Sequence, residues 1–175
     1  MTKNQINNNK LLQILIDLIN NKNGEYLLIS QIILIILHFL PGYIFLNTNI
    51  KEITKIFGFA IITYSLIFII MAFINLGSSI SPFPRPKRNA TLKKNKIYSI
   101  YRHPIYHSLI CLSFGIFLIK FSILHLILFI CLTINLRIKS KYEEKYLIKK
   151  FNDYRSYISS TPAIFNSVLF LDWRE

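Results

Sequence analysis

The sequence predicts an all-α integral membrane protein with about four transmembrane helices, two of which form a helical hairpin. Of the 175 residues, 53% are hydrophobic and only five are glycine, which is too apolar for a soluble basic domain. Several apolar runs approach the roughly 20 residues that cross a hydrocarbon core. Many of the basic residues lie in the loop before the last two of these runs and in the segment that follows them. Together these observations favour a membrane bundle.

Residues 1–26 are predicted to be a retained N-terminal segment that holds an interfacial helix. The opening stretch has a basic start, but Asp17 breaks its apolar run and no small-residue cleavage site follows, so it does not fit a signal peptide. Apolar residues recur between polar ones over residues 11–19, as in a helix that lies at a membrane surface.

Residues 27–76 are predicted to form two transmembrane helices. Residues 27–46 are an apolar run without a charge, and residues 53–76 are a second run that only Lys55 interrupts, near its start. Both are close to the length that a membrane crossing needs. A short turn over residues 47–52 joins them.

Residues 77–175 are predicted to hold a basic loop, the helical hairpin and a basic C-terminal segment. Two apolar runs, 105–119 and 121–136, are separated by Lys120, and each is shorter than a comfortable single crossing. A soluble core could also contain helices of this length. The two longer runs upstream therefore favour the membrane interpretation.

The distribution of charge predicts a multi-pass protein whose basic segments face the cytoplasm. The loop over residues 77–103 has seven basic residues and no acidic one: Arg85, Lys87, Arg88, Lys93, Lys94, Lys96 and Arg102. By the positive-inside rule this loop is cytoplasmic, and the hairpin returns the basic residues 137–155 to the same side. The net charge of +13 would suit nucleic acid or an anionic lipid surface. The apolar runs favour membrane lipids as partners and not nucleic acid.

A pair of acidic residues follows the hairpin. No Asp or Glu occurs from residue 53 to residue 142, and then Glu143 and Glu144 stand together. At ~1.5 Å of rise per residue, the arm from His103 to Lys120 and the arm back to Glu143 are of comparable length. We therefore expect His103 and the carboxylate pair to lie near the same membrane face.

Two tyrosines, Tyr98 and Tyr106, flank His103 in the sequence, so a small-molecule pocket is predicted where these side chains and the carboxylates meet. A plainer interpretation stays open. The carboxylates can be solvated helix residues that pair with neighbouring Lys or Arg. His103-Pro104 can be a simple helix start, because proline is favoured in the first helical turn.

No metal site is predicted. His103 and His107 are four residues apart, as metal ligands can be, but neither an HExxH pattern nor a third ligand accompanies them. Cys111 and Cys131 both lie in apolar stretches and provide neither a disulfide framework nor a four-ligand metal site.

Three stretches, SPFPRPKRNATL, IYSIYRHPIY and EEKYLIKKFNDYRSYISSTPAIF, occur in this order around the hairpin. They resemble the isoprenylcysteine carboxyl methyltransferase and phospholipid methyltransferase family, over residues 76–165. The resemblance implies a membrane enzyme that binds S-adenosylmethionine in a cytoplasm-facing pocket. It also implies transfer of the methyl group to a lipid-like or prenylated acceptor that reaches in from the bilayer.

The resemblance implies site residues position by position. The residues expected to bind the cofactor are Tyr98, His103, Pro104, Tyr106, Glu143 and Glu144. Arg102 and Arg137 are the expected catalytic residues, which would bind either the cofactor carboxylate or the acceptor. Carboxylates can neutralise the sulfonium and ammonium of this cofactor, and Arg or His can bind its carboxylate. Two departures from the family pattern, Lys96 in place of Gly and His107-Ser108 in place of a small-residue pair, leave the acceptor unassigned.

The expected reaction is methylation of a carboxylate on an isoprenylcysteine-like or other lipid-like acceptor, which needs no general base because the carboxylate is already ionised. In one alternative the acceptor is a phospholipid amine, whose proton passes to Glu143, Glu144 or His103. A second alternative is a membrane protein of the sterol-reductase type, which uses a nicotinamide cofactor. A third alternative is a non-catalytic membrane subunit that binds anionic lipid or a partner. The sequence gives no signal for an oligomeric state.

Overall fold

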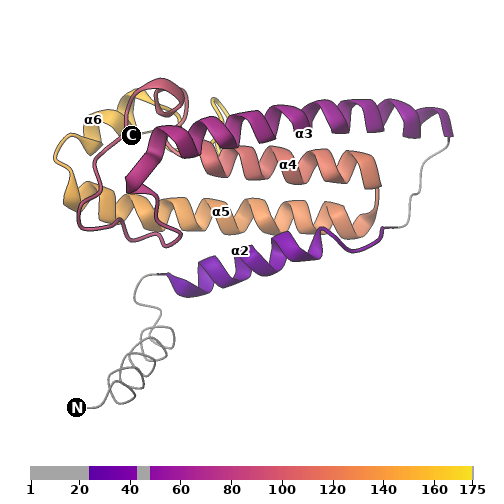
Figure 1. Ribbon diagram of the computed structural model, residues 1–175, viewed down its shortest axis with the longest axis horizontal. Coiled ribbons are helices and arrows are strands. Elements are labelled where there is room, and N and C mark those ends of the chain that lie inside the picture. Colours follow the sequence, from indigo (N-terminus) through magenta and orange to yellow (C-terminus); the bar gives the residue numbers. More distant parts are fainter. Residues whose placement is uncertain (1–23, 43–47, 175) are drawn as a thin grey trace, which may run out of the picture.

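The computed structural model describes residues 24–42 and 48–174, and within these residues it is all-helical, without a strand. The helices are α2 (Glu25–Leu37), α3 (Thr48–Leu76), η1 (Gly77–Ser79), η2 (Lys96–Ser99), α4 (Pro104–Lys120), α5 (Ile123–Lys150) and α6 (Tyr154–Ser160). Figure 1 shows α3, α4 and α5 side by side, with α2 inclined against α5. The predicted all-α class is confirmed.

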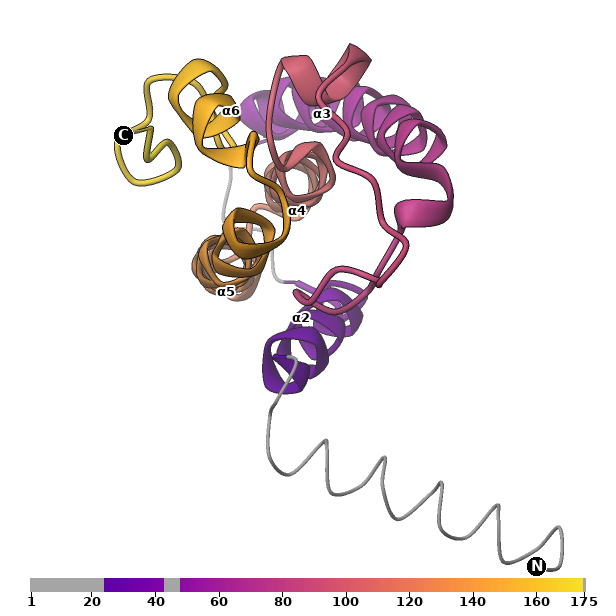
Figure 2. The same cartoon turned by 90° about the vertical axis from the view of Figure 1, so that its left-hand side faces the viewer.

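The helix α4 lies at the centre of the bundle, with α3 along one side and α5 along another (Figure 2). Two glycines face each other in the contact between α3 and α4. A Cβ atom added to Gly58 would lie 2.8 Å from the Gly115 carbonyl oxygen, and one added to Gly115 would lie 2.9 Å from the Gly58 carbonyl oxygen. Small residues allow such backbone approach between membrane helices. The contact also places the start of α3 beside the end of α4.

The predicted hairpin is formed by α4 and α5. Pro104 occupies the first turn of α4, and Phe121 ends the helix in the left-handed region with φ of 38°. Ser122 caps α5 by accepting a hydrogen bond from the His125 backbone nitrogen at 3.3 Å. Beyond the predicted end at residue 136, α5 continues to Lys150.

Two of the described helices, α3 with 29 residues and α5 with 28, are long and apolar enough to cross a membrane. The helices α2, with 13 residues, and α4, with 17, are shorter. The predicted span over residues 53–76 coincides with α3, which begins slightly earlier. Of the predicted span over residues 27–46, the described part is helical to Leu37, before Pro41. The expected interfacial helix at residues 11–19 lies outside the described residues.

The last two turns of α5 belong to the polar end of the bundle. At 1.5 Å per residue, about 20 residues of α5 fill a hydrocarbon core of about 30 Å. With 28 residues, α5 is therefore longer than such a core is thick. At this end, α6 and the C-terminal segment pack over the hairpin, and Ala163, Ile164 and Leu171 join a core with Leu132 and Leu136 of α5.

Candidate functional site

The two arms of the hairpin bring His103 to the carboxylate pair. His103 directly precedes α4, and Glu143 and Glu144 lie near the end of α5. The His103 Nε2 atom is 3.0 Å from Glu144 Oε1, and its Nδ1 atom is 3.8 Å from Glu143 Oε2. The predicted convergence at one end of the bundle is confirmed in this geometry.

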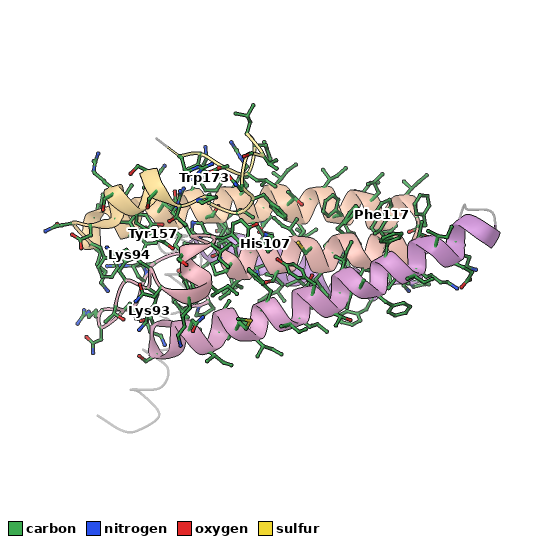
Figure 3. All side chains as sticks on the ribbon, turned by 90° about the horizontal axis from the view of Figure 1, so that it is seen from above. Lys93, Lys94, His107, Phe117, Tyr157 and Trp173 are labelled. Carbon is green, nitrogen blue, oxygen red and sulfur yellow. The ribbon has the colours of Figure 1, made fainter. Side chains whose placement is uncertain are left out.

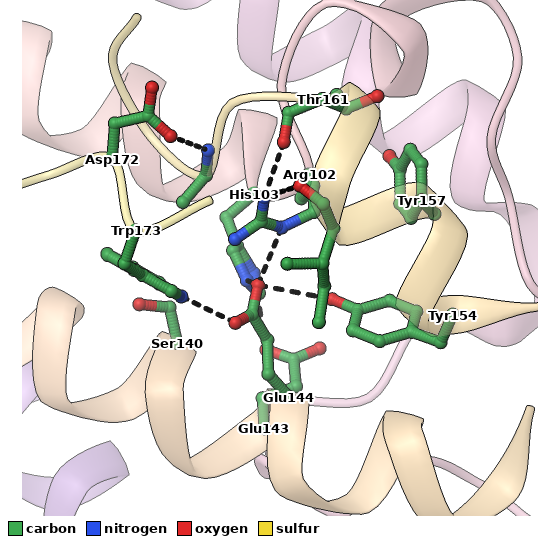
Figure 4. A network of polar contacts seen from close by, with 12 residues as sticks. Arg102, His103, Ser140, Glu143, Glu144, Tyr154, Tyr157, Thr161, Asp172 and Trp173 are labelled. Atoms are coloured by element: carbon green, nitrogen blue, oxygen red, sulfur yellow. Dashed lines mark hydrogen bonds and ion pairs between the residues drawn. The ribbon is translucent and has the colours of Figure 1, made fainter. Parts of the chain in front are cut away.

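Glu144 is the centre of a buried hydrogen-bond network (Figure 4). Its Oε1 atom accepts from Arg102 Nε at 2.8 Å, from His103 Nε2 at 3.0 Å and from the Tyr154 hydroxyl at 3.3 Å. Its Oε2 atom accepts from Trp173 Nε1 at 2.6 Å. One carboxylate therefore ties together the start of α4, α5, α6 and the C-terminal segment.

The network keeps Glu144 ionised. Burial alone raises the pKa of this carboxyl group. The hydrogen bond from His103 and the positive charges of His103 and Arg102 outweigh burial, and they lower the pKa to about 2. Glu144 is therefore a stable anion that holds its partners in place.

Arg102 is held rigidly and has one unpaired nitrogen. Its side chain is fully buried, and Nη1 donates to the carbonyl oxygens of Ile158, at 3.0 Å, and of Thr161. The buried Nη2 atom has no hydrogen-bond partner among the described residues. A buried donor of this kind calls for an acceptor that the protein does not itself provide.

The C-terminal segment is fastened onto the start of α4. The backbone nitrogens of Arg102 and His103 donate to the carbonyl oxygens of Pro162 and Ala163, each at 2.9 Å. These bonds fix the return path of the chain that carries Trp173 back to the network. Neither Trp173 nor Tyr154 is a predicted site residue, because nothing local in the sequence links them to residues 102–103.

A cavity of about 280 Å³ adjoins the network. Its polar lining consists of Gln31, Ser81, Tyr98, Arg102, His103, Tyr106, Lys139 and Glu143. Its apolar lining includes Leu28, Phe73, Leu76, Ile80 and Ile105. Among the predicted residues Pro104 also lines it. A smaller chamber of about 80 Å³ under the basic loop shares Tyr98, Arg102 and Glu143 with this cavity. The larger cavity, at about 280 Å³, is near the lower end of the volume range for small-molecule sites, which begins at about 300 Å³.

Glu143, unlike its neighbour Glu144, lines the cavity. Its side chain is 28% exposed, and its Oε2 atom accepts from the Tyr106 hydroxyl at 2.8 Å. Burial raises the pKa of Glu143, although the nearby charge of His103 and the hydrogen bond from Tyr106 oppose the shift. The two adjacent carboxylates thus have different surroundings and pKa shifts of opposite sign.

Lys139 is a cavity residue that is not among the predicted site residues. It lies one turn before Glu143 on α5, its Nζ atom donates to Gln31 Oε1 on α2 at 2.6 Å, and it is 3% exposed. The sequence feature that could have identified Lys139 is its spacing of four residues from Glu143, which puts both side chains on one face of a helix. This spacing is informative only if the helix continues past residue 136, where the predicted apolar run ended.

The remaining predicted residues take different positions. The rings of His103 and Tyr106 are stacked, with centroids 5.3 Å apart. Tyr98 lies in η2, and its carbonyl oxygen accepts from the Tyr157 hydroxyl. Burial, followed by the charge of Glu143, raises the pKa of Tyr98. Arg137 is not brought to the cavity: its Nε atom donates to the Phe170 carbonyl oxygen at 2.6 Å, so it holds the C-terminal segment.

Among the described residues, no group of three or more His, Cys, Asp or Glu side chains could hold a metal ion. The family model for phospholipid methyltransferases matches residues 53–154. The matched portion contains most of α3, the basic loop, the whole hairpin and both carboxylates, and it ends before Trp173. No curated protein matches the chain.

Proposed function

Because the chain belongs to the phospholipid methyltransferase family, we propose that this membrane methyltransferase uses S-adenosylmethionine to methylate a carboxylate of an isoprenylcysteine-like or other lipid-like acceptor. The main support is the composition of the 280 Å³ cavity. Its lining combines the charged side chains of Glu143, Lys139 and Arg102 with apolar side chains from several elements, such as Leu28 of α2 and Phe73 of α3. By the positive-inside rule, the basic loop beside this cavity supports a site that faces the cytoplasm.

The residues of the cavity fit the proposed cofactor, which carries a sulfonium, an ammonium and a carboxylate. Glu143 supplies a negative charge for the cationic groups, and Arg102 Nη2 is a buried donor suited to a carboxylate. Tyr98, His103 and Tyr106 supply aromatic walls, against which cations also bind. When bound, the cofactor supplies an electrophilic methyl group. Glu144 acts indirectly, because it fixes Arg102 and His103.

Lys139 is the residue that we assign to the acceptor. Its ammonium is buried beside the apolar wall of the cavity, where a lipid-like molecule would present its polar end. Pairing with Lys139 would orient an acceptor carboxylate, which has a pKa near 4 and needs no general base at neutral pH. The apolar side chains exclude water, so positioning and a dry site supply the catalysis.

Glu143→Gln is expected to weaken S-adenosylmethionine binding about tenfold or more, because a charge-assisted interaction in the cavity is lost. Calorimetry on the detergent-purified chain measures this. Glu52→Gln is the matched control, since Glu52 is exposed on α3 and pairs with Lys55. Equal affinity of Glu143→Gln and wild type would contradict the site. No binding by the wild type would favour the reductase-like or the non-catalytic alternative.

The raised pKa of Glu143 favours a second acceptor class, a phospholipid amine, because a buried carboxylate of raised pKa is a stronger base. A base acts in its deprotonated form, so amine methylation would accelerate as pH rises through the pKa of Glu143 and of the amine. Carboxylate methylation would stay nearly constant between about pH 6 and 8, because the acceptor is already ionised. We expect the flat profile in a radiolabel transfer assay. A rate that climbs steadily with pH, and that Glu143→Gln flattens, would identify the amine.

A further inference from the structure

A second cavity, of about 310 Å³, lies at the other end of the bundle. Its walls come from α2, α4 and α5, with apolar side chains such as Phe39 and Ile116, and Lys120 lines it at the end of α4. Figure 3 shows Phe117 of α4 far along the bundle from Trp173. None of the residues that line the first cavity lines this one. It is therefore a separate cavity, toward the Lys120 end of the bundle.

The polar pair inside this cavity is already satisfied. The Ser113 hydroxyl lies 2.6 Å from His38 Nε2, and His38 Nδ1 lies 2.7 Å from the Leu34 carbonyl oxygen. A carbonyl oxygen only accepts, so Nδ1 carries a proton, and the Ser113 hydroxyl is hydrogen-bonded to Nε2. Both donors are used within the protein, and they tie the end of α2 to α4. The interior of the cavity is thus suited to hydrocarbon.

The charge of Lys120 identifies the chemistry of the polar end. Lys120 is the charged side chain in a lining that otherwise consists of Ser113, His38 and apolar residues. Gly58 of α3 approaches Ile119, so the start of α3, with Lys51 and Lys55, lies at the same end. Among the described residues at this end the acidic side chain is Glu52, and it pairs with Lys55 at 2.8 Å. An anionic headgroup would therefore be attracted to Lys120.

We propose that this cavity binds one hydrocarbon chain of an anionic phospholipid from the leaflet opposite the first cavity, with Lys120 at the phosphate. Its volume limits the occupant. A dry cavity of about 150 Å³ accommodates benzene. A cavity of about 310 Å³ therefore has room for roughly a dozen carbon atoms, which is one chain and not two. This site is independent of the acceptor chemistry, because it shares no residue with the methyl-transfer site.

The test is native mass spectrometry of the purified full chain after equilibration with equimolar phosphatidylglycerol and phosphatidylcholine of identical acyl chains. The wild type is expected to retain one phosphatidylglycerol, with a preference of about fivefold over phosphatidylcholine. Lys120→Gln should abolish that preference. Ile116→Trp should fill the cavity and remove the retained lipid of either kind. The melting temperature of each variant in detergent, measured in parallel, reports its fold.

Lys51→Gln is the matched control, because Lys51 lies at the same end but on α3, outside the cavity lining. It should keep the preference of the wild type. Equal reductions in Lys51→Gln and Lys120→Gln would mean that the basic end attracts anionic lipid without a site, and would overturn the proposal. Equal retention of both lipids by the wild type would overturn it as well. Methyl transfer is measured separately, so its failure would leave this result unaffected.

Discussion

Replacing Glu144 by glutamine is expected to lower the free energy of unfolding by about 3–5 kcal/mol, the cost of leaving a buried charge without its partner. The carboxylate accepts from Arg102, His103 and Tyr154 at one oxygen and from Trp173 at the other. An amide nitrogen cannot accept a hydrogen bond. In either orientation of the glutamine side chain, the nitrogen would face a donor that loses its acceptor. Unfolding of the purified chain in a graded detergent mixture measures the change.

The same residue gives the wild type a specific acid sensitivity. The folded pKa of Glu144 is about 2, below its ordinary value of 4.5, so the group stabilises the fold at pH values above 4.5. That stabilisation, roughly 3 kcal/mol, is lost as pH falls from 4.5 toward 2. Glu144→Gln should lack this part of the acid transition.

Glu143→Gln is the matched control for this experiment, because the two carboxylates are adjacent. Burial raises the pKa of Glu143, so ionisation of this group costs more in the folded than in the unfolded chain. The Tyr106 hydroxyl can still donate to an amide oxygen. We expect Glu143→Gln to leave stability unchanged or slightly higher. A stability loss equal to that of Glu144→Gln would contradict the separate roles that we assign to the two residues.

The second large effect is expected at Lys139. Lys139→Gln should lower kcat/KM for methyl transfer about 100-fold, because removing one partner of a buried charge pair typically costs 2–5 kcal/mol. Glutamine can still bond to Gln31, so the loss reports the charge. S-adenosylmethionine affinity should stay within about twofold, since the acceptor is what Lys139 holds. A methyl-transfer assay and calorimetry on the same preparation separate the two effects.

Two variants sharpen this experiment. Lys139→Arg keeps the positive charge and should recover part of the activity. Lys145→Gln removes a charge from an exposed position of the same helix and should have no effect. Full activity of Lys139→Gln would remove the residue from the acceptor site. Equal losses of activity and cofactor affinity would reassign it to the cofactor.

The sequence by itself predicted the helical class, the hairpin and the meeting of His103 with the carboxylates. These features follow from local rules, because apolar run length indicates a membrane helix and the helical rise per residue fixes the reach of each arm. Lys120, between the two apolar runs, marked the turn. The RHPIY and EEKYL stretches likewise predicted the family, and the match over residues 53–154 confirmed it.

Only the tertiary structure decided how Glu143 and Glu144 divide their roles. Successive helical residues point about 100° apart, so the rotation of α5 about its axis determines which carboxylate lines the cavity. That rotation is set by packing, through contacts of Leu132 and Leu136 with the core that includes Ile164. The return of Trp173 to Glu144 likewise depends on bonds between distant parts of the chain. Such contacts leave no periodic signal in the sequence, because they join residues that no local rule relates.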